Sequence, residues 1–76
     1  MSKIFSGKFV IKVLEKYFCF VEVSQKGSHI KLQKSIGKES VVTIVPNHKE
    51  LQTGTLLGIL ELAKIDKKEF LRFAKK

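Results

Sequence analysis

The sequence predicts an α+β fold in which helices pack on one face of a three-stranded antiparallel sheet. Apolar residues recur at helical spacing near both ends of the chain. The middle of the chain instead holds short β-branched or alternating segments, separated by turns that contain glycine. The expected order is therefore helix, three strands, helix and a short C-terminal helix. With 76 residues the chain has the length of one small domain, and we expect residues 1–76 to form a single domain.

The first helix is expected from about Gly7 to Tyr17, with Ser6 as its N-cap. Apolar residues at spacings of three and four form one stripe along this helix, namely Phe9, Val10, Val13, Leu14 and Tyr17. Lysines and a glutamate fall on the opposite side. The helix should therefore bury one face against the rest of the protein and expose the other to water.

Three strands are expected next. The first spans Phe18–Ser24, a segment rich in aromatic and β-branched residues, and the second spans His29–Gln33. The third spans Val41–Val45, and Pro46 directly after it is typical of the end of an edge strand. Each of the first two strands is followed by a segment that contains glycine, which predicts a turn.

Alternation along the second strand predicts which of its side chains face the core. Ile30 and Leu32 are its apolar pair and should point toward the helices. His29, Lys31 and Gln33 should then point to the other face of the sheet, which we expect to be open. The pattern thus places an ionisable imidazole beside an ammonium group on a surface that no helix covers.

A loop over residues 47–53 should lead to a second helix at about Thr55–Ala63, whose buried stripe consists of Leu56, Ile59, Leu60 and Ala63. Gly58 lies inside this helix, where glycine costs about 1 kcal/mol relative to alanine, and this suggests that another element approaches closely there. A last short helix should begin after Asp66 as N-cap, with Glu69 completing a capping box.

The chain is strongly basic. Fifteen lysines and arginines face seven acidic residues, which gives a formal net charge of +8. Such an excess favours binding to polyanions through the release of counterions, although a merely solvated basic face is the alternative. Arg72 is the only arginine among these residues. Lysine suits phosphate contact, whereas arginine reads guanine edges, so binding to a nucleic-acid backbone is favoured over base readout.

Known nucleotide-binding and metal-binding motifs are absent from the sequence, and Cys19, His29 and His48 share no metal-ligand spacing. We therefore expect no metal and no cofactor. The single cysteine forms no disulfide within the chain and is expected to be a small buried residue. No signal peptide is evident, and no apolar run reaches the length of about 18 residues that spans a membrane, so we expect a cytoplasmic protein without membrane contact.

His29 is the residue best suited to carry chemistry. It follows a glycine turn, and an imidazole, with an ordinary pKa of about 6.5, both accepts and donates protons near neutral pH. Lys26, Lys31 and Lys34 are expected to surround the ring and to hold a phosphate beside it. The alternative for His29 is an exposed hairpin histidine without function, and His48 is interpreted as a solvated loop residue.

Four segments, in order, resemble the HicA toxin family: SGKFVIKVLEKYFCFVEV, QKGSHIKL, VVTIVPNHKEL and TGTLLGILELAKI. The likeness covers roughly Ser6 to Phe73. The resemblance implies a fold like that of the double-stranded-RNA-binding domain. It also implies a toxin that cleaves messenger RNA and that is neutralised by a HicB-like antitoxin covering the active face. The family's catalytic histidine corresponds to His29, and the glycine and serine before it to Gly27 and Ser28.

Two positions depart from the family pattern. The glycine often found between the first helix and the first strand is replaced by the segment Tyr17-Phe18-Cys19. A polar residue or a second histidine often follows the catalytic one, whereas Ile30 stands there in this chain. The first change affects how the helix joins the sheet, and the second affects substrate contacts.

The leading hypothesis is a metal-independent endoribonuclease in which the substrate's own 2′-hydroxyl is the nucleophile. His29 would act as general acid/base and Lys26 would stabilise negative charge, while Gly27, Ser28, Lys31 and Lys34 would contact RNA. The group that protonates the leaving oxygen stays open among Lys26, His48 and water. The alternative is a double-stranded-RNA-binding module without catalysis. Direct DNA binding is not expected, because no basic recognition helix is evident.

Overall fold

The computed structural model describes residues 4–75, and it confirms the α+β class and the predicted element order. The elements are α1 (Gly7–Tyr17), β1 (Val21–Lys26), β2 (His29–Ile36), β3 (Glu39–Pro46), α2 (Thr53–Ala63) and α3 (Lys67–Ala74). None of the helices in this part of the chain has the length and the apolar character that crossing a membrane requires.

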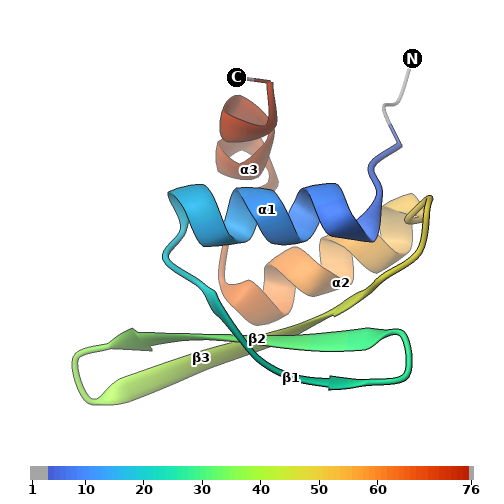
Figure 1. Ribbon diagram of the computed structural model, residues 1–76. Coiled ribbons are helices and arrows are strands. Elements are labelled where there is room, and N and C mark those ends of the chain that lie inside the picture. The colour runs from blue at the N-terminus through green and yellow to red at the C-terminus, as the bar shows by residue number, and fades with distance from the viewer. Residues whose placement is uncertain (1–3, 76) are drawn as a thin grey trace.

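The strands form one antiparallel sheet in the order β1-β2-β3. In Figure 1, α1 and α2 lie on the same side of this sheet, and the opposite side carries no helix. The α3 helix lies beyond α1 and α2, on the far side of them from the sheet. The prediction that the two longer helices cover one sheet face is thus confirmed.

Both hairpins close through two-residue turns whose first residue is a glycine. Gly27 has φ +60° and Gly37 has φ +58°, values that type II′ hairpin turns require at this position. Because the turns are so short, strand pairing continues to their edges. The second and third strands are therefore longer than predicted and reach Ile36 and Pro46, and the first extends to Lys26.

The first strand begins at Val21, so the predicted start at Phe18 was wrong. The backbone N–H groups of Phe18 and Phe20 both donate to the carbonyl of Leu14, at 3.1 Å each, and this turns the chain from α1 toward the sheet. Cys19, between them, adopts φ +62° and is exposed, so the expectation of a buried cysteine was also wrong. At this positive φ a cysteine accepts the backbone strain that a glycine would avoid.

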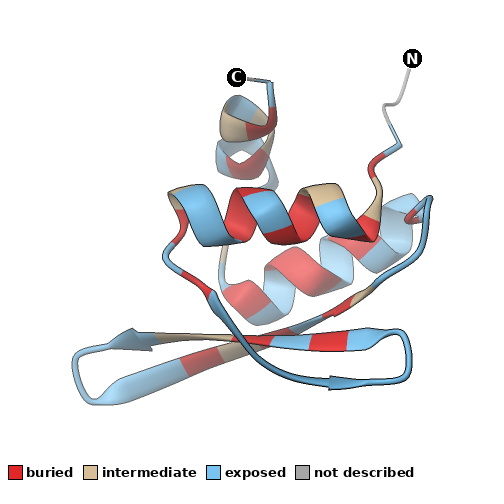
Figure 2. Ribbon diagram, viewed as in Figure 1, coloured by how far each residue is buried: buried red, intermediate tan, exposed pale blue. Residues whose placement is uncertain are grey.

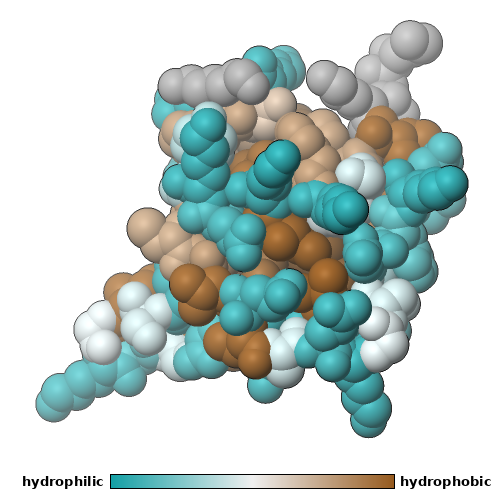
Figure 3. Space-filling view, in the orientation of Figure 1, coloured by the Kyte–Doolittle hydropathy of each residue, from teal (hydrophilic) through white to brown (hydrophobic). Residues whose placement is uncertain are grey.

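The core lies between the sheet and the helices, as the buried stripes of α1 and α2 in Figure 2 show. Ile30 and Leu32 point into it as predicted. On β3 the inward residues include Thr43, which is completely buried. Its hydroxyl donates to the carbonyl of Ile59 at 2.8 Å and joins the sheet to α2. The exposed positions of α1 are mostly lysines, and Figure 3 shows hydrophilic side chains over the part of the surface where α1 lies.

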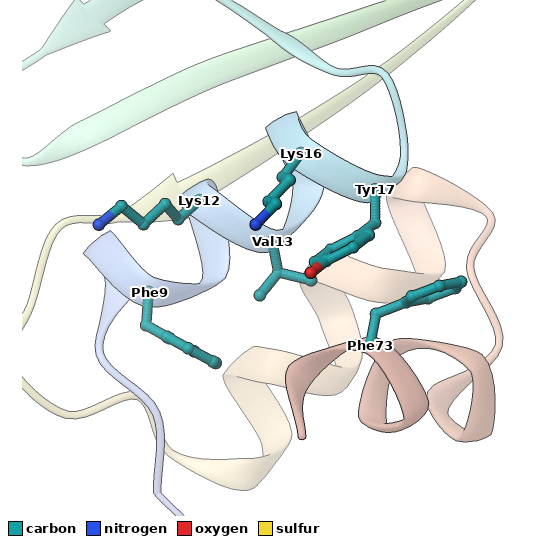
Figure 4. A pocket seen from close by; sticks show the side chains of 6 residues that line it. All are labelled: Phe9, Lys12, Val13, Lys16, Tyr17 and Phe73. Atoms are coloured by element: carbon teal, nitrogen blue, oxygen red, sulfur yellow. The ribbon is translucent and has the colours of Figure 1, made fainter. Parts of the chain in front are cut away.

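Aromatic contacts join α3 to α1. Tyr17 and Phe73 stack with ring centroids 4.8 Å apart, and the ring of Phe18 meets Phe73 edge-on at 5.4 Å. Figure 4 shows Tyr17 and Phe73 next to each other, and both side chains line a hollow of about 170 Å³. Asp66 is the N-cap of α3 as predicted, but its side chain makes no capping hydrogen bond, so the predicted capping box is not formed. Packing of the rings therefore holds this helix.

Two helical glycines have opposite surroundings. A Cβ atom on Gly7 would overlap the carbonyl oxygen of Pro46 and would lie 3.0 Å from the Cα atom of Asn47. The first turn of α1 thus packs directly on the backbone at the end of β3. Around Gly58, by contrast, nothing lies within 4 Å of the position a Cβ would take. The close approach that we inferred from Gly58 was therefore wrong.

Replacing Gly7 with alanine is expected to destabilise the fold by about 1–3 kcal/mol, because the added methyl group overlaps backbone that has no room to move. Gly58→Ala is the matched control, since alanine fits there and helix propensity predicts a gain of about 0.5–1 kcal/mol. The free energy of unfolding of each variant, measured by urea denaturation, checks both signs. Equal effects of the two substitutions would contradict the assigned contact.

Candidate active site

The open sheet face holds a hollow of about 530 Å³ that is lined by Ser24, Lys26, His29, Lys31 and Ile44. His29 begins β2 and pairs with Lys26 on one side and with Pro46 on the other. Its side chain is exposed, as the alternation along the strand predicts. Three strands therefore contribute to this hollow, and His29 sits on the central one.

Charge in this hollow is of one sign. Lys26 and Lys31 are the ionised side chains among the five lining residues, and none of the five is acidic. Ile44, which is opposite Lys31 in the strand register, adds apolar surface and is 43% exposed. An imidazole between two ammonium groups, on a partly apolar floor, suits a phosphate ester attached to a larger group.

Lys34 does not belong to this group. It lies three residues beyond Lys31 on β2, so strand alternation puts it on the opposite face of the sheet. There it is half-buried, and its Nζ atom lies 5.1 Å from the centre of the Phe20 ring. The expectation that Lys34 surrounds His29 was therefore wrong, because it counted neighbours along the sequence and ignored the faces of the strand.

A second histidine lies at the same end of the sheet. Ser28, in the turn before His29, has its Oγ atom 3.4 Å from the Nε2 atom of His48. Both side chains are exposed. No sequence pattern connects these two residues, because they are twenty positions apart and His48 stands in a loop. The pairing of Pro46 with His29 in the sheet brings this loop to the turn.

Backbone hydrogen bonds hold the loop that carries His48. The N–H of Asn47 donates to the carbonyl of Ser28 at 2.6 Å, and the N–H of Gly7 donates to the carbonyl of His48 at 2.8 Å. The N–H of Leu51 donates to the carbonyl of Phe5, also at 2.8 Å. The loop is thus fixed to the hairpin turn on one side and to the start of α1 on the other. The expected solvent exposure of His48 is confirmed, but the residue is held in place.

Over residues 4–75, no three side chains of histidine, cysteine, aspartate or glutamate form a group that could hold a metal ion. The ionisable side chains at the site are those of lysines and histidines. The chemistry that this chain's own residues offer there is proton transfer by imidazole and charge stabilisation by ammonium groups.

The family model described as "HicA toxin of bacterial toxin-antitoxin" matches residues 7–65. The chain belongs to the HicA toxin family. The matched region begins with α1 and ends between α2 and α3, so it includes the whole sheet with His29 and the loop with His48. As a HicA toxin, the protein is the toxin of a toxin–antitoxin pair and has an antitoxin as partner. No curated protein and no solved structure matched the chain significantly.

Because Gly27 has a positive φ, we predict that its substitution changes the site locally. Gly27→Ala should lower stability by about 1–3 kcal/mol through backbone strain, since the space around this glycine is open. It should also shift the imidazole NMR signals of His29, two residues away. Gly37→Ala strains the other turn equally and is the control, because it should reduce stability by a similar amount and leave the His29 signals unchanged. Shifted signals in both variants would contradict a local effect.

Proposed function

We propose that this HicA toxin is an endoribonuclease that cleaves messenger RNA on the open face of its sheet, without a metal ion and with His29 as general acid/base. The observation that supports this proposal is the exposed imidazole of His29 in a hollow that it shares with Lys26 and Lys31. The net charge of +8 supports it further, because a polyanionic substrate is attracted over a long range.

In this reaction the neutral imidazole of His29 takes the proton of the 2′-hydroxyl beside the phosphate that is cut. The 2′-oxygen then attacks phosphorus, and the bond from phosphorus to the 5′-oxygen breaks on the opposite side. The products are a 2′,3′-cyclic phosphate and a 5′-hydroxyl end. Lys26, with Lys31, stabilises the negative charge that grows on the non-bridging phosphate oxygens.

In this proposal the RNA contacts the hairpin turn between β1 and β2. Gly27 offers backbone without a side chain in the way, and Ser28 offers a hydroxyl, so both suit contact with a phosphate or a ribose. Lys31 contributes charge from inside the hollow. Lys34 faces away from it and is assigned no contact with the phosphate that is cut. Because the nucleophile is the 2′-hydroxyl, DNA is not a substrate.

The partner in this proposal is a HicB-like antitoxin that inhibits by covering His29. The toxin surface is basic, so an acidic antitoxin surface would be complementary to it. Covering the open sheet face blocks RNA without any change in the fold of the toxin. The apolar Ile44 beside the two lysines gives such a partner a hydrophobic contact at the centre of the charged area.

His29→Ala is expected to reduce RNA cleavage by about 10²-fold or more, because general acid–base help contributes about 10²–10⁴ to such rates. The side chain is exposed, so the variant should fold normally. Cleavage by purified protein in excess chelator measures the effect, with a second RNA that carries a 2′-deoxy residue at the cut site. Cleavage that needs a divalent metal, or that proceeds at the 2′-deoxy position, would rule out this mechanism.

Two lysine variants provide the controls. Lys26→Ala should reduce cleavage less than His29→Ala, because Lys31 partly replaces the lost charge. Lys38→Ala removes one positive charge from the turn at the far end of β2 and should leave cleavage nearly unchanged. If His29→Ala cleaves RNA as well as wild type does, His29 is not the general acid/base. If neither wild type nor any variant cleaves while all bind duplex RNA, the protein is a binding module.

The cognate antitoxin is expected to bind with nanomolar or tighter affinity and to stop cleavage. The association rate should fall as salt is raised, because attraction between opposite charges speeds the encounter. Stopped-flow measurements across a salt series check the rate, and cleavage assays with added antitoxin check inhibition. An antitoxin that binds fully while RNA cleavage continues would show that His29 is not covered.

A further inference from the structure

We propose that His48 is the general acid of this site, the group that protonates the 5′-oxygen as it leaves. This inference rests on the proposed ribonuclease function and assigns its second acid–base group. Three observations carry it: the contact of His48 with Ser28, the backbone hydrogen bonds that fix its loop, and the type of side chain.

The geometry brings the imidazole of His48 to the serine that directly precedes His29. Ser28 directly precedes His29, and its Oγ atom lies 3.4 Å from the Nε2 atom of His48. That separation is long for a hydrogen bond, so a substrate oxygen can readily take the place of the hydroxyl. Hydrogen bonds of a catalytic group are often long before substrate binds, and they tighten in the complex. In this proposal a phosphate bound at the Ser28 turn meets His48 through the place of the Ser28 hydroxyl and His29 from the start of β2.

The reaction needs such a pair. In-line attack places the entering 2′-oxygen and the leaving 5′-oxygen on opposite sides of phosphorus, so a base and an acid are required at two separate positions. His29 takes one proton from the 2′-hydroxyl, and protonated His48 gives one proton to the 5′-oxygen. After the reaction the His29 ring is protonated and the His48 ring is neutral. Proton exchange of both rings with water restores the starting state.

The lysines of the hollow suit this step less well. A lysine ammonium group has an ordinary pKa of about 10.4, whereas a proton donor works best when its pKa lies near the working pH. Tyr17 is the only tyrosine of the chain, and it is stacked on Phe73 between α1 and α3. Among the described side chains near the Ser28 turn, His48 is the one whose chemistry and fixed position both fit.

The test replaces the leaving oxygen with sulfur. Cut sites are first mapped on ordinary RNA with wild-type protein, and the same RNA is then made with a bridging 5′-sulfur at one of these sites. A thiol ionises with a pKa of about 8.5, so a leaving sulfur needs far less help from an acid than an alcohol oxygen does. Cleavage rates of wild type, His48→Ala, His48→Gln and His29→Ala are measured on both substrates.

We expect His48→Ala and His48→Gln to lose about 10²-fold or more on the oxygen substrate and to recover most of that loss on the sulfur substrate. Glutamine can keep a hydrogen bond to Ser28 but cannot deliver a proton, so its failure separates acid catalysis from positioning. Glu50→Gln, in the same exposed loop, is the control and should cleave both substrates like wild type.

His48→Ala activity equal to wild type on the oxygen substrate would overturn the proposal. So would an equal loss on both substrates, or full activity of His48→Gln, because either result shows a structural role. His29→Ala should stay impaired on the sulfur substrate, since it acts on the other proton. If His29→Ala cleaves normally, the proposed role of His29 fails, whatever His48 does, and if wild type cleaves neither substrate, the proposed ribonuclease function itself fails.

Discussion

The first turn of α1 packs on the backbone that follows β3, and this is possible because Gly7 has no side chain to overlap the carbonyl oxygen of Pro46. The same junction fixes the loop after β3, since the N–H of Gly7 donates to the carbonyl of His48. On its other side the loop donates from Asn47 to the turn at Ser28. One tight backbone contact thus sets the position of the first helix, the end of the sheet and both histidine-bearing segments.

The two faces of the sheet have different roles: one packs in the core, and the other carries the residues of the candidate site. One face of β2 gives Ile30 and Leu32 to the core under the helices, and the other gives His29 and Lys31 to the open hollow. Substitutions at the open positions should therefore have little effect on folding, and under the proposed function they would change activity. The absence of a covering helix leaves room for RNA or for an antitoxin, and both would meet the same basic surface with Ile44 within it.

The regular elements could be predicted from local patterns because each is built from contacts that are close in sequence. Ser6 does cap α1, where its Oγ atom accepts from the N–H of Phe9 at 3.0 Å, and the stripe on α1 is buried apart from its half-buried ends. The start of β1 was mispredicted because phenylalanine favours strands. In the structure the N–H of Phe18 instead donates to the carbonyl of Leu14, in the last turn of α1. An aromatic residue that is buried in the tertiary structure can lie in a strand or in a connection, and the sequence pattern does not distinguish the two.

The sequence by itself determined the α+β class, the exposure of His29 and its place beside Lys26 and Lys31, because these follow from strand alternation and a two-residue turn. Counting neighbours along the chain could not place Lys34, since the same alternation puts it on the other face, where its Nζ atom lies 5.1 Å from the centre of the Phe20 ring. It could not bring His48 to Ser28 either. Only the pairing of β2 with β3 and the docking of α1 on the following loop decided that contact, because residues twenty apart in sequence become neighbours through tertiary structure alone.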